Sequence, residues 1–168
     1  MEFYFPMNHL SPRDLANVFR SHRPAKELHV FCGKLEKLDF RTIRGFTKGY
    51  IDLVFQHAGR FYLVDWKSNY LGPDLVDYDQ TALLQTMQAE LYTLQYHLYT
   101  LALHQYLRYR KPQYRYEDDF GGVFYIFIRG LNRHSGPETG VFFDLPDADL
   151  IHALGHTLIP GYVKHLEE

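Results

Sequence analysis

Two apolar runs separated by a short polar break dominate the middle of the chain. Residues 49–56 and 61–67 are rich in Val, Ile, Leu, Phe and Tyr, and the break at residues 57–60 contains Gly59. This pattern predicts a β-hairpin. A turn within the break pairs Gln56 with Phe61 and Val54 with Leu63, and the same register brings two charged positions opposite each other.

The two opposed charges are the carboxylates of Asp52 and Asp65. Directly opposed residues share one face of a hairpin, with Cβ atoms roughly 4.5–5.5 Å apart, and Lys67 projects from the same face two residues further on. Like charges in this arrangement repel unless a cation lies beside them. Mg²⁺ prefers such oxygen ligands, so the pattern predicts a metal site. A purely structural Asp–Lys pair at a strand end is the alternative.

The segments before the hairpin predict a strand, a helix and a second strand. Residues 1–5 are apolar and aromatic and end at Pro6, which favours a strand. Ser11 is a suitable N-cap and Pro12 a suitable first residue for a helix that ends near residue 23. Residues 28–31 form a short apolar run that we interpret as another strand.

A long helix is predicted after the hairpin. Asp79 can cap its start, and no Gly or Pro follows until Pro112. Six apolar positions alternate in spacings of three and four residues, which is the seam of an amphipathic helix: Leu84, Met87, Leu91, Leu94, Leu98 and Leu101. Beside the seam runs a stripe of amide and phenol groups, either a polar flank or a functional line: Gln88, Tyr92, Gln95, Tyr99 and Tyr106.

The last third of the chain continues the alternation of helices and strands. We expect a charged connector over residues 109–119, a buried strand over 122–128 and an edge strand over 141–143. Pro146 and Asp147 open a final helix. Together these elements predict one α/β domain over residues 1–168.

Composition limits the function without fixing it. The formal net charge is −2, so any bound DNA must be held by local positive charge or by a partner. The single cysteine, Cys32, excludes a disulfide framework and fits a reducing compartment. We expect no secretory leader and no membrane segment, and therefore a cytoplasmic protein. Basic residues lie near the predicted site and in a second cluster, which we interpret as a solvated helix end: Arg44, Lys48 and Lys67, then Arg108, Arg110, Lys111 and Arg115.

The charged residues of the hairpin also carry a family resemblance. Asp52, followed on the next strand by Asp65-Trp66-Lys67, is similar to the PD-(D/E)xK nuclease motif. A longer stretch of the sequence resembles the C-terminal nuclease domain family of RecB, the β subunit of exodeoxyribonuclease V. The similar segments are residues 44–55, 62–72, 94–104 and 120–125. The resemblance covers most of the chain, and it implies a restriction-endonuclease-like fold with a mixed central sheet flanked by helices.

The resemblance implies a metal-dependent nuclease site. Asp52 and Asp65, with the main-chain carbonyl of Trp66, would hold Mg²⁺. Lys67 would orient the attacking water and stabilise the transition state. Gln95 and Tyr99 match the Gln-x-x-x-Tyr motif that RecB-like nucleases place near the catalytic face.

The resemblance further implies phosphodiester hydrolysis of DNA in double-strand-break repair and recombination. The substrates would be single-stranded ends produced by unwinding, and the partners would be RecC- and RecD-like subunits. The family takes a further ligand, a histidine, from a helix upstream of the first strand, and none of the present histidines matches it. The chain therefore reads as a fragment of a larger helicase–nuclease that binds Mg²⁺ weakly alone. A non-catalytic DNA- or subunit-binding module with a nuclease fold is the alternative.

Overall fold

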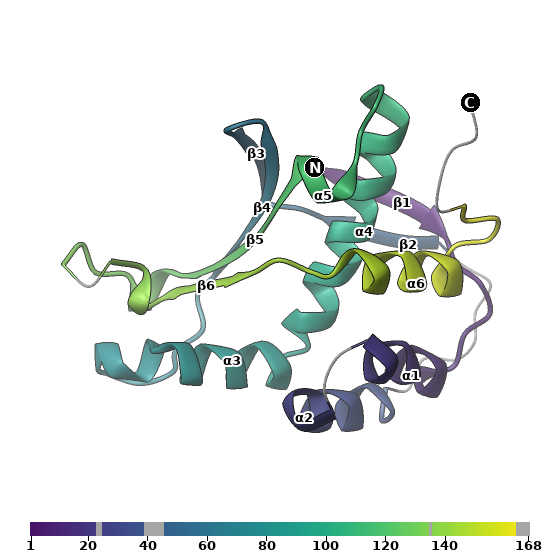
Figure 1. Ribbon diagram of the computed structural model, residues 1–168. Coiled ribbons are helices and arrows are strands. Elements are labelled where there is room, and N and C mark those ends of the chain that lie inside the picture. The colour runs from purple at the N-terminus through teal and green to yellow at the C-terminus, as the bar shows by residue number, and fades with distance from the viewer. Residues whose placement is uncertain (23–24, 39–45, 135, 164–168) are drawn as a thin grey trace.

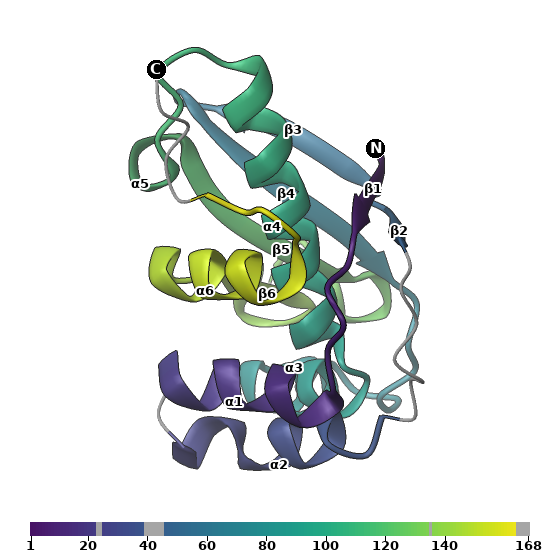
Figure 2. The same cartoon turned by 90° about the vertical axis from the view of Figure 1, so that its right-hand side faces the viewer.

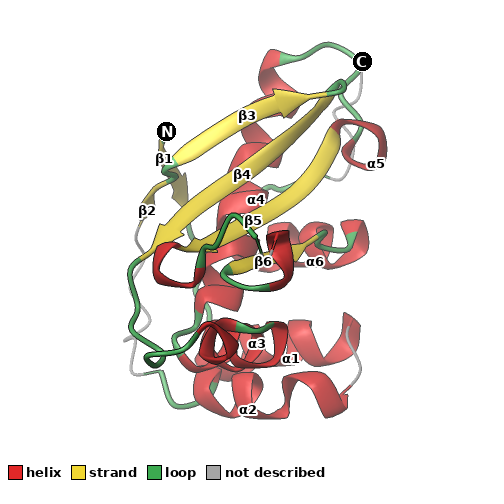
Figure 3. Ribbon diagram, turned by 90° about the vertical axis from the view of Figure 1, so that its left-hand side faces the viewer, coloured by secondary structure: helices red, strands yellow, loops and turns green. Residues whose placement is uncertain are grey.

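The centre of the molecule is a four-stranded mixed sheet with the order β3-β4-β5-β6 (Figure 3). The computed structural model describes residues 1–22, 25–38, 46–134 and 136–163. β3 (Leu53–His57) and β4 (Arg60–Lys67) form an antiparallel hairpin, β5 (Phe120–Phe127) pairs with β4 in parallel, and β6 (Val141–Asp144) is an antiparallel edge. The parallel pair requires a crossover, which the chain makes through its two central helices.

Helices cover one face of this sheet and form the core with it. α4 (Tyr92–Arg110) and α6 (Ala148–Leu158) lie on that side, and α3 (Gln80–Ala89) crosses below them (Figure 1). Alternate residues of the central strands point into this layer, as the period of two in a strand requires. Leu63 of β4 and Val123 and Phe127 of β5 are buried in the core. The fold is thus the expected restriction-endonuclease-like α/β arrangement.

The opposite face of the sheet carries a row of aromatic rings. Phe55 and Tyr62 stack across the hairpin with ring centroids 5.0 Å apart, and Phe124 lies 4.9 Å from Phe143. Tyr62 and Phe124 join the two pairs at 5.9 Å. These residues alternate along the strands with those buried in the core, so their side chains lie on the side turned away from α4.

A second, smaller sheet and two helices surround this core. β1 (Glu2–Pro6) pairs antiparallel with β2 (Phe46–Tyr50), and α1 (Pro12–His22) packs against α2 (Ala25–Leu35) (Figure 2). Short elements complete the described chain: η1 (Leu75–Tyr78), α5 (Tyr116–Asp119), η2 (Ile128–Gly130) and η3 (Gly136–Glu138). None of the described helices has the length and apolar character needed to cross a bilayer.

Several local predictions are confirmed. The hairpin has the expected register, with Val54 opposite Leu63, and its two-residue turn places Ala58 and Gly59 at positive φ. Helix starts are also as expected. The Ser11 hydroxyl accepts a hydrogen bond from the Asp14 amide, and helix-capping side chains open α3 and α6: Asp79 and Asp147.

The predicted long helix is wrong in one respect, because it is broken between α3 and α4. Leu91 adopts a left-handed conformation, with φ of 57°, directly before α4. The break turns the chain, so that Met87 of α3 and Leu101 of α4 are each buried although the two helices run in different directions (Figure 1). Leu84, a member of the expected seam, is 46% exposed.

Two predicted strands are also corrected. Residues 28–31 belong to α2, where Phe31, Cys32 and Leu35 are buried at helical spacing, because tertiary packing outweighs the β preference of a short apolar run. Residues 49–56 do not form one strand, since Gly49 and Tyr50 end β2 and pair with β1. Ile51 and Asp52 connect the two strands.

A buried group of histidines and tyrosines joins α4 to α6. His104 is 3% exposed, and its ring lies 5.2 Å from that of His152, while Tyr114 contributes its hydroxyl 3.4 Å from His104 Nδ1. Burial, reinforced by His152 and by the nearby Arg108 charge, lowers the pKa of His104 to about 3. The folded protein therefore holds His104 neutral.

This burial predicts a specific pH dependence of stability. The unfolded chain binds a proton at His104 below about pH 6.5 and the folded chain does not, so stability present at neutral pH is lost as the pH falls. Between pH 7 and pH 5 the loss should be about 2 kcal/mol. In His104→Phe, the free energy of unfolding measured with urea should therefore depend less steeply on pH than in wild type. The exposed His9→Gln variant should keep the wild-type profile, and equal slopes in wild type and His104→Phe would contradict the assignment.

Candidate active site

The centre of the candidate site is an ion pair on β4. Asp65 and Lys67 lie two residues apart, so both side chains point toward α4. Lys67 Nζ lies 2.6 Å from Asp65 Oδ2, and the two side chains are only 11% and 7% exposed. β4 is an inner strand, paired on both edges, which explains why these charges are buried.

Asp52 reaches the same place from the other strand of the hairpin. The hydrogen-bonded ladder ends with Leu53 opposite Val64, so Asp52 lies one residue beyond it, level with Asp65. Its carboxylate is exposed, and Oδ2 accepts a hydrogen bond of 3.0 Å from the Trp66 amide. Asp52 is therefore tied to the backbone between Asp65 and Lys67.

The two carboxylates interact electrostatically. Burial raises the pKa of Asp65 above its usual value, the Lys67 ammonium opposes this shift, and the Asp52 charge adds to it. A negative charge on Asp52 can raise the pKa of Asp65 only because the two groups lie near each other. The hydrogen bond from the Trp66 amide, directly after Asp65, places the Asp52 carboxylate beside that of Asp65, as the register predicted.

α4 brings the predicted amide and phenol to Lys67. Lys67 Nζ donates to Gln95 Oε1 at 3.0 Å, and Gln95 Nε2 donates to the Tyr99 hydroxyl at 2.9 Å. Burial is the main cause that raises the pKa of Tyr99, and the charges of both carboxylates add to it. The structure therefore gathers all five sequence-predicted side chains on one side of the sheet: Asp52, Asp65, Lys67, Gln95 and Tyr99.

Two further tyrosines belong to this group and were not assigned to it from the sequence. The Tyr92 ring centroid lies 3.8 Å from Lys67 Nζ, and the Tyr125 ring centroid lies 5.0 Å from it. Tyr125 also donates from its hydroxyl to Gln95 Oε1 at 2.9 Å. Tyr92 is part of the helical stripe noted in the sequence. Tyr125 joins the group because β5 pairs in parallel with β4, which sets Tyr125 beside Asp65.

Other predicted participants lie elsewhere or remain open. Tyr106, the last member of the stripe, is exposed and lies near Arg110. The side chain of Trp66 is half exposed, and its proposed ligand is the main-chain carbonyl. Lys48 forms an ion pair of 2.6 Å with Glu2, and Arg44 lies outside the described residues.

The second basic cluster is largely paired within the chain, as expected for a helix end. Lys111 forms an ion pair with Asp119, and Arg115 lies 3.2 Å from Asp118. Arg108 lies over the Tyr162 ring at 5.5 Å. These contacts reduce the positive charge that this end of α4 offers to a partner.

The donor chemistry fits a hard divalent cation held from one side. Asp52 and Asp65 supply carboxylate oxygens, the ligand type that Mg²⁺ prefers. The Asp65 carboxylate already accommodates a cation, the Lys67 ammonium, in direct contact. Within the part of the chain that the structure describes, no cluster of three or more His, Cys, Asp or Glu side chains is arranged to hold a metal. Water and substrate oxygens would have to complete the coordination.

The fold and the site together define a class of protein. The mixed four-stranded sheet flanked by helices is that of a restriction-endonuclease-like fold, and Asp52, directly before β3, lies beside Asp65 and Lys67 of β4. Comparison with known sequences narrows this class to one family. The RecBCD enzyme subunit RecB of Escherichia coli (strain K12) is 48% identical over 152 residues, which cover 90% of this chain and 12% of that protein.

Two further relatives agree with this match. RecB of Haemophilus influenzae is 53% identical over 119 residues, covering 71% of this chain and 10% of its own length. RecB of Mycobacterium tuberculosis H37Rv is 35% identical over 164 residues, covering 92% of this chain and 15% of its own length. No protein-family model matches the chain. The chain is a RecB-like domain, and it spans only a small part of the length of these relatives.

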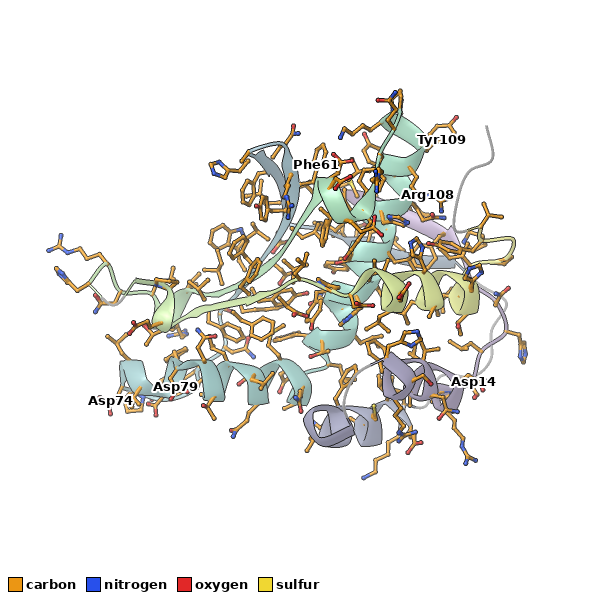
Figure 4. The ribbon with its side chains drawn as sticks, viewed as in Figure 1. Asp14, Phe61, Asp74, Asp79, Arg108 and Tyr109 are labelled. Atoms are coloured by element: carbon orange, nitrogen blue, oxygen red, sulfur yellow. The ribbon has the colours of Figure 1, made fainter. Side chains whose placement is uncertain are left out.

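The coupling of the two carboxylates predicts a measurable pKa change. Asp52→Asn removes the negative charge that helps to raise the pKa of Asp65, so the pKa of Asp65 should fall in this variant while staying above its usual value because of burial. Carboxyl ¹³C NMR titration without added metal would measure it. The distant, exposed Asp74 (Figure 4) offers a matched control, because Asp74→Asn should leave the Asp65 titration unchanged. An unchanged Asp65 titration in Asp52→Asn would show that the two carboxylates are not coupled.

Proposed function

We propose that the chain is the nuclease domain of a RecBCD-type helicase–nuclease and hydrolyses DNA phosphodiester bonds with Mg²⁺. The observation that carries the proposal is the contact network around Lys67. Its ammonium touches a carboxylate suited to a metal and also hydrogen-bonds a helix amide. A purely structural ion pair at a strand end would not need a second carboxylate, Asp52, held beside it.

The residues that would hold the metal are Asp52, Asp65 and the main-chain carbonyl of Trp66. A divalent cation at such a site supplies Lewis-acid stabilisation of a phosphate and makes water a better nucleophile at neutral pH. The protein's own contribution is the geometry of the two carboxylates. The Trp66 amide holds the Asp52 carboxylate by a hydrogen bond, and the Lys67 ammonium holds the Asp65 carboxylate by an ion pair.

Lys67 and its helix partners would act on the phosphate and the attacking water. The Lys67 ammonium is a fixed positive charge, which stabilises the negative charge that develops in the transition state. Gln95 positions this ammonium by accepting its hydrogen bond. The Tyr99 hydroxyl oxygen accepts a hydrogen bond from Gln95 Nε2, so the Tyr99 O–H can donate to a phosphate oxygen or a water.

The proposed context is the one that the relatives' names describe. They are RecB subunits of the RecBCD enzyme, and we propose RecC- and RecD-like partners, DNA repair and recombination, and a cytoplasmic location for the protein that carries this domain. Single-stranded ends released by unwinding are the proposed substrate. A net charge of −2 supports a role for partners in holding the DNA.

Removal of one carboxylate tests the proposed chemistry. Asp65→Asn keeps the shape of the side chain and an oxygen for Lys67 but removes the charge that would hold the metal. Mg²⁺-dependent degradation of single-stranded DNA should fall to background at a temperature at which circular dichroism shows the variant to be folded. The melting temperature should fall, because the buried Lys67 ammonium loses its counter-charge. Asp74→Asn serves as the control and should cleave as wild type does. Equal cleavage by Asp65→Asn and wild type would refute a metal-dependent role for this group.

The charge of Lys67 is tested separately. Lys67→Gln keeps much of the side-chain length but removes the positive charge. Turnover should fall by ~100-fold or more, as for other transition-state donors, while Mn²⁺ binding measured by calorimetry should persist. Near-normal turnover would remove Lys67 from the mechanism. If wild type binds DNA but cleaves none with any divalent metal, the alternative of a non-catalytic binding module gains support.

A further inference from the structure

The contacts of Lys67 leave little of its ammonium without a neighbour. Asp65 lies at 2.6 Å, Gln95 Oε1 at 3.0 Å and the Tyr92 ring centroid at 3.8 Å. Tyr125 adds a second aromatic face at 5.0 Å. Only the first of these contacts involves a residue that a divalent metal would also use.

The aromatic contacts are themselves held in place. The Tyr92 hydroxyl donates to Asn69 Oδ1 at 3.2 Å, in the loop that follows β4, and its ring lies 5.9 Å from that of Tyr125. The Tyr92 ring is therefore fixed both at the helix and at its hydroxyl end. A cation over such a ring face is attracted by the ring quadrupole, and more strongly where water is excluded.

The chemistry of the donors also fixes the orientation of the Gln95 amide. An ammonium can only donate hydrogen bonds, so the oxygen of Gln95, not its nitrogen, must face Lys67. The Tyr125 hydroxyl donates to the same oxygen. Gln95 Nε2 is thereby directed to Tyr99, which must accept. Tyr125 thus supports a single direction of hydrogen bonding from Lys67 to Tyr99.

We propose that Tyr92 and Tyr125 are positioning residues for the nuclease reaction, which together hold the Lys67 ammonium by their ring faces and through Gln95. This inference rests on the proposed nuclease function. The two rings and the Gln95 oxygen offer Lys67 contacts that do not depend on Asp65. Lys67 can therefore stay at the site while the Asp65 carboxylate is shared with another cation.

Tyr92 supplies the sharpest test, because its ring and its hydroxyl can be removed separately. Protons above an aromatic face are shifted upfield in NMR spectra. With ¹³C-labelled lysine, the Lys67 Cε protons should be shifted upfield in wild type and should lose most of that shift in Tyr92→Leu. Tyr92→Phe keeps the ring and should restore the shift. Tyr109→Leu, at the exposed end of the same helix (Figure 4), is the matched control and should keep it.

Kinetics on the same variants then test whether the position matters for turnover. In Tyr92→Leu, kcat for single-stranded DNA should fall about 30-fold, the size of a desolvated cation–π contact. The KM for DNA and the Mn²⁺ affinity should change less than about twofold. Tyr92→Phe should recover most of kcat. In Tyr125→Phe the ring remains but the Gln95 oxygen loses a donor, so a fall in kcat with the NMR shift retained is expected.

The outcomes separate this inference from the proposed function. An unchanged Lys67 shift in Tyr92→Leu would refute the aromatic contact, whatever the activity. A lost shift with unchanged kcat would refute a positioning role while leaving the nuclease function intact. If wild type cleaves no DNA, the proposed function and the positioning role both fail, and the NMR shift still reports separately whether the aromatic contact exists.

Discussion

The structure depends on how a buried positive charge is accommodated between the sheet and α4. Taking an ammonium and a carboxylate out of water costs several kcal/mol per ion unless close contacts offset it. Lys67 and Asp65 meet this demand with an ion pair of 2.6 Å, and Lys67 has an amide oxygen and two aromatic faces in addition. These contacts come from β4, α4 and β5, so the three elements must be arranged together for the charge to be tolerated.

The arrangement explains features of the fold that have no obvious role alone. Parallel pairing of β5 with β4 sets Tyr125 beside Asp65, and the left-handed residue before α4 directs that helix across the sheet. On the far side of the network, Phe3 of β1 packs against Tyr99 at 5.5 Å. A Cβ at Gly49 would lie 2.4 Å from the Phe3 ring and 3.1 Å from that of Tyr99, so β2 approaches this closely only without a side chain there.

Local patterns predicted much of the site, and non-local packing accounts for what they missed. The period of two in a hairpin was enough to place Asp52 level with Asp65 and Lys67 on the same face. Helical spacing was enough to put Gln95 and Tyr99 together. No local pattern reveals that β5 lies parallel to β4, so Tyr125 was not assigned. The break at Leu91 and the helical state of residues 28–31 depend on burial against distant elements, which outweighs local propensity.

The same contacts argue that lysine, not arginine, suits this position. A guanidinium is planar, presents five donors in a fixed fork and needs matching acceptors around its edge. Here the surroundings of the charge are one carboxylate, one amide oxygen and two ring faces, converging from different directions on a single nitrogen. A compact ammonium with rotatable donors can satisfy contacts placed in this way. The space between Asp65, Gln95 and the two tyrosines is therefore matched to a point charge, which is also the form of charge that a phosphate oxygen can approach from any open side.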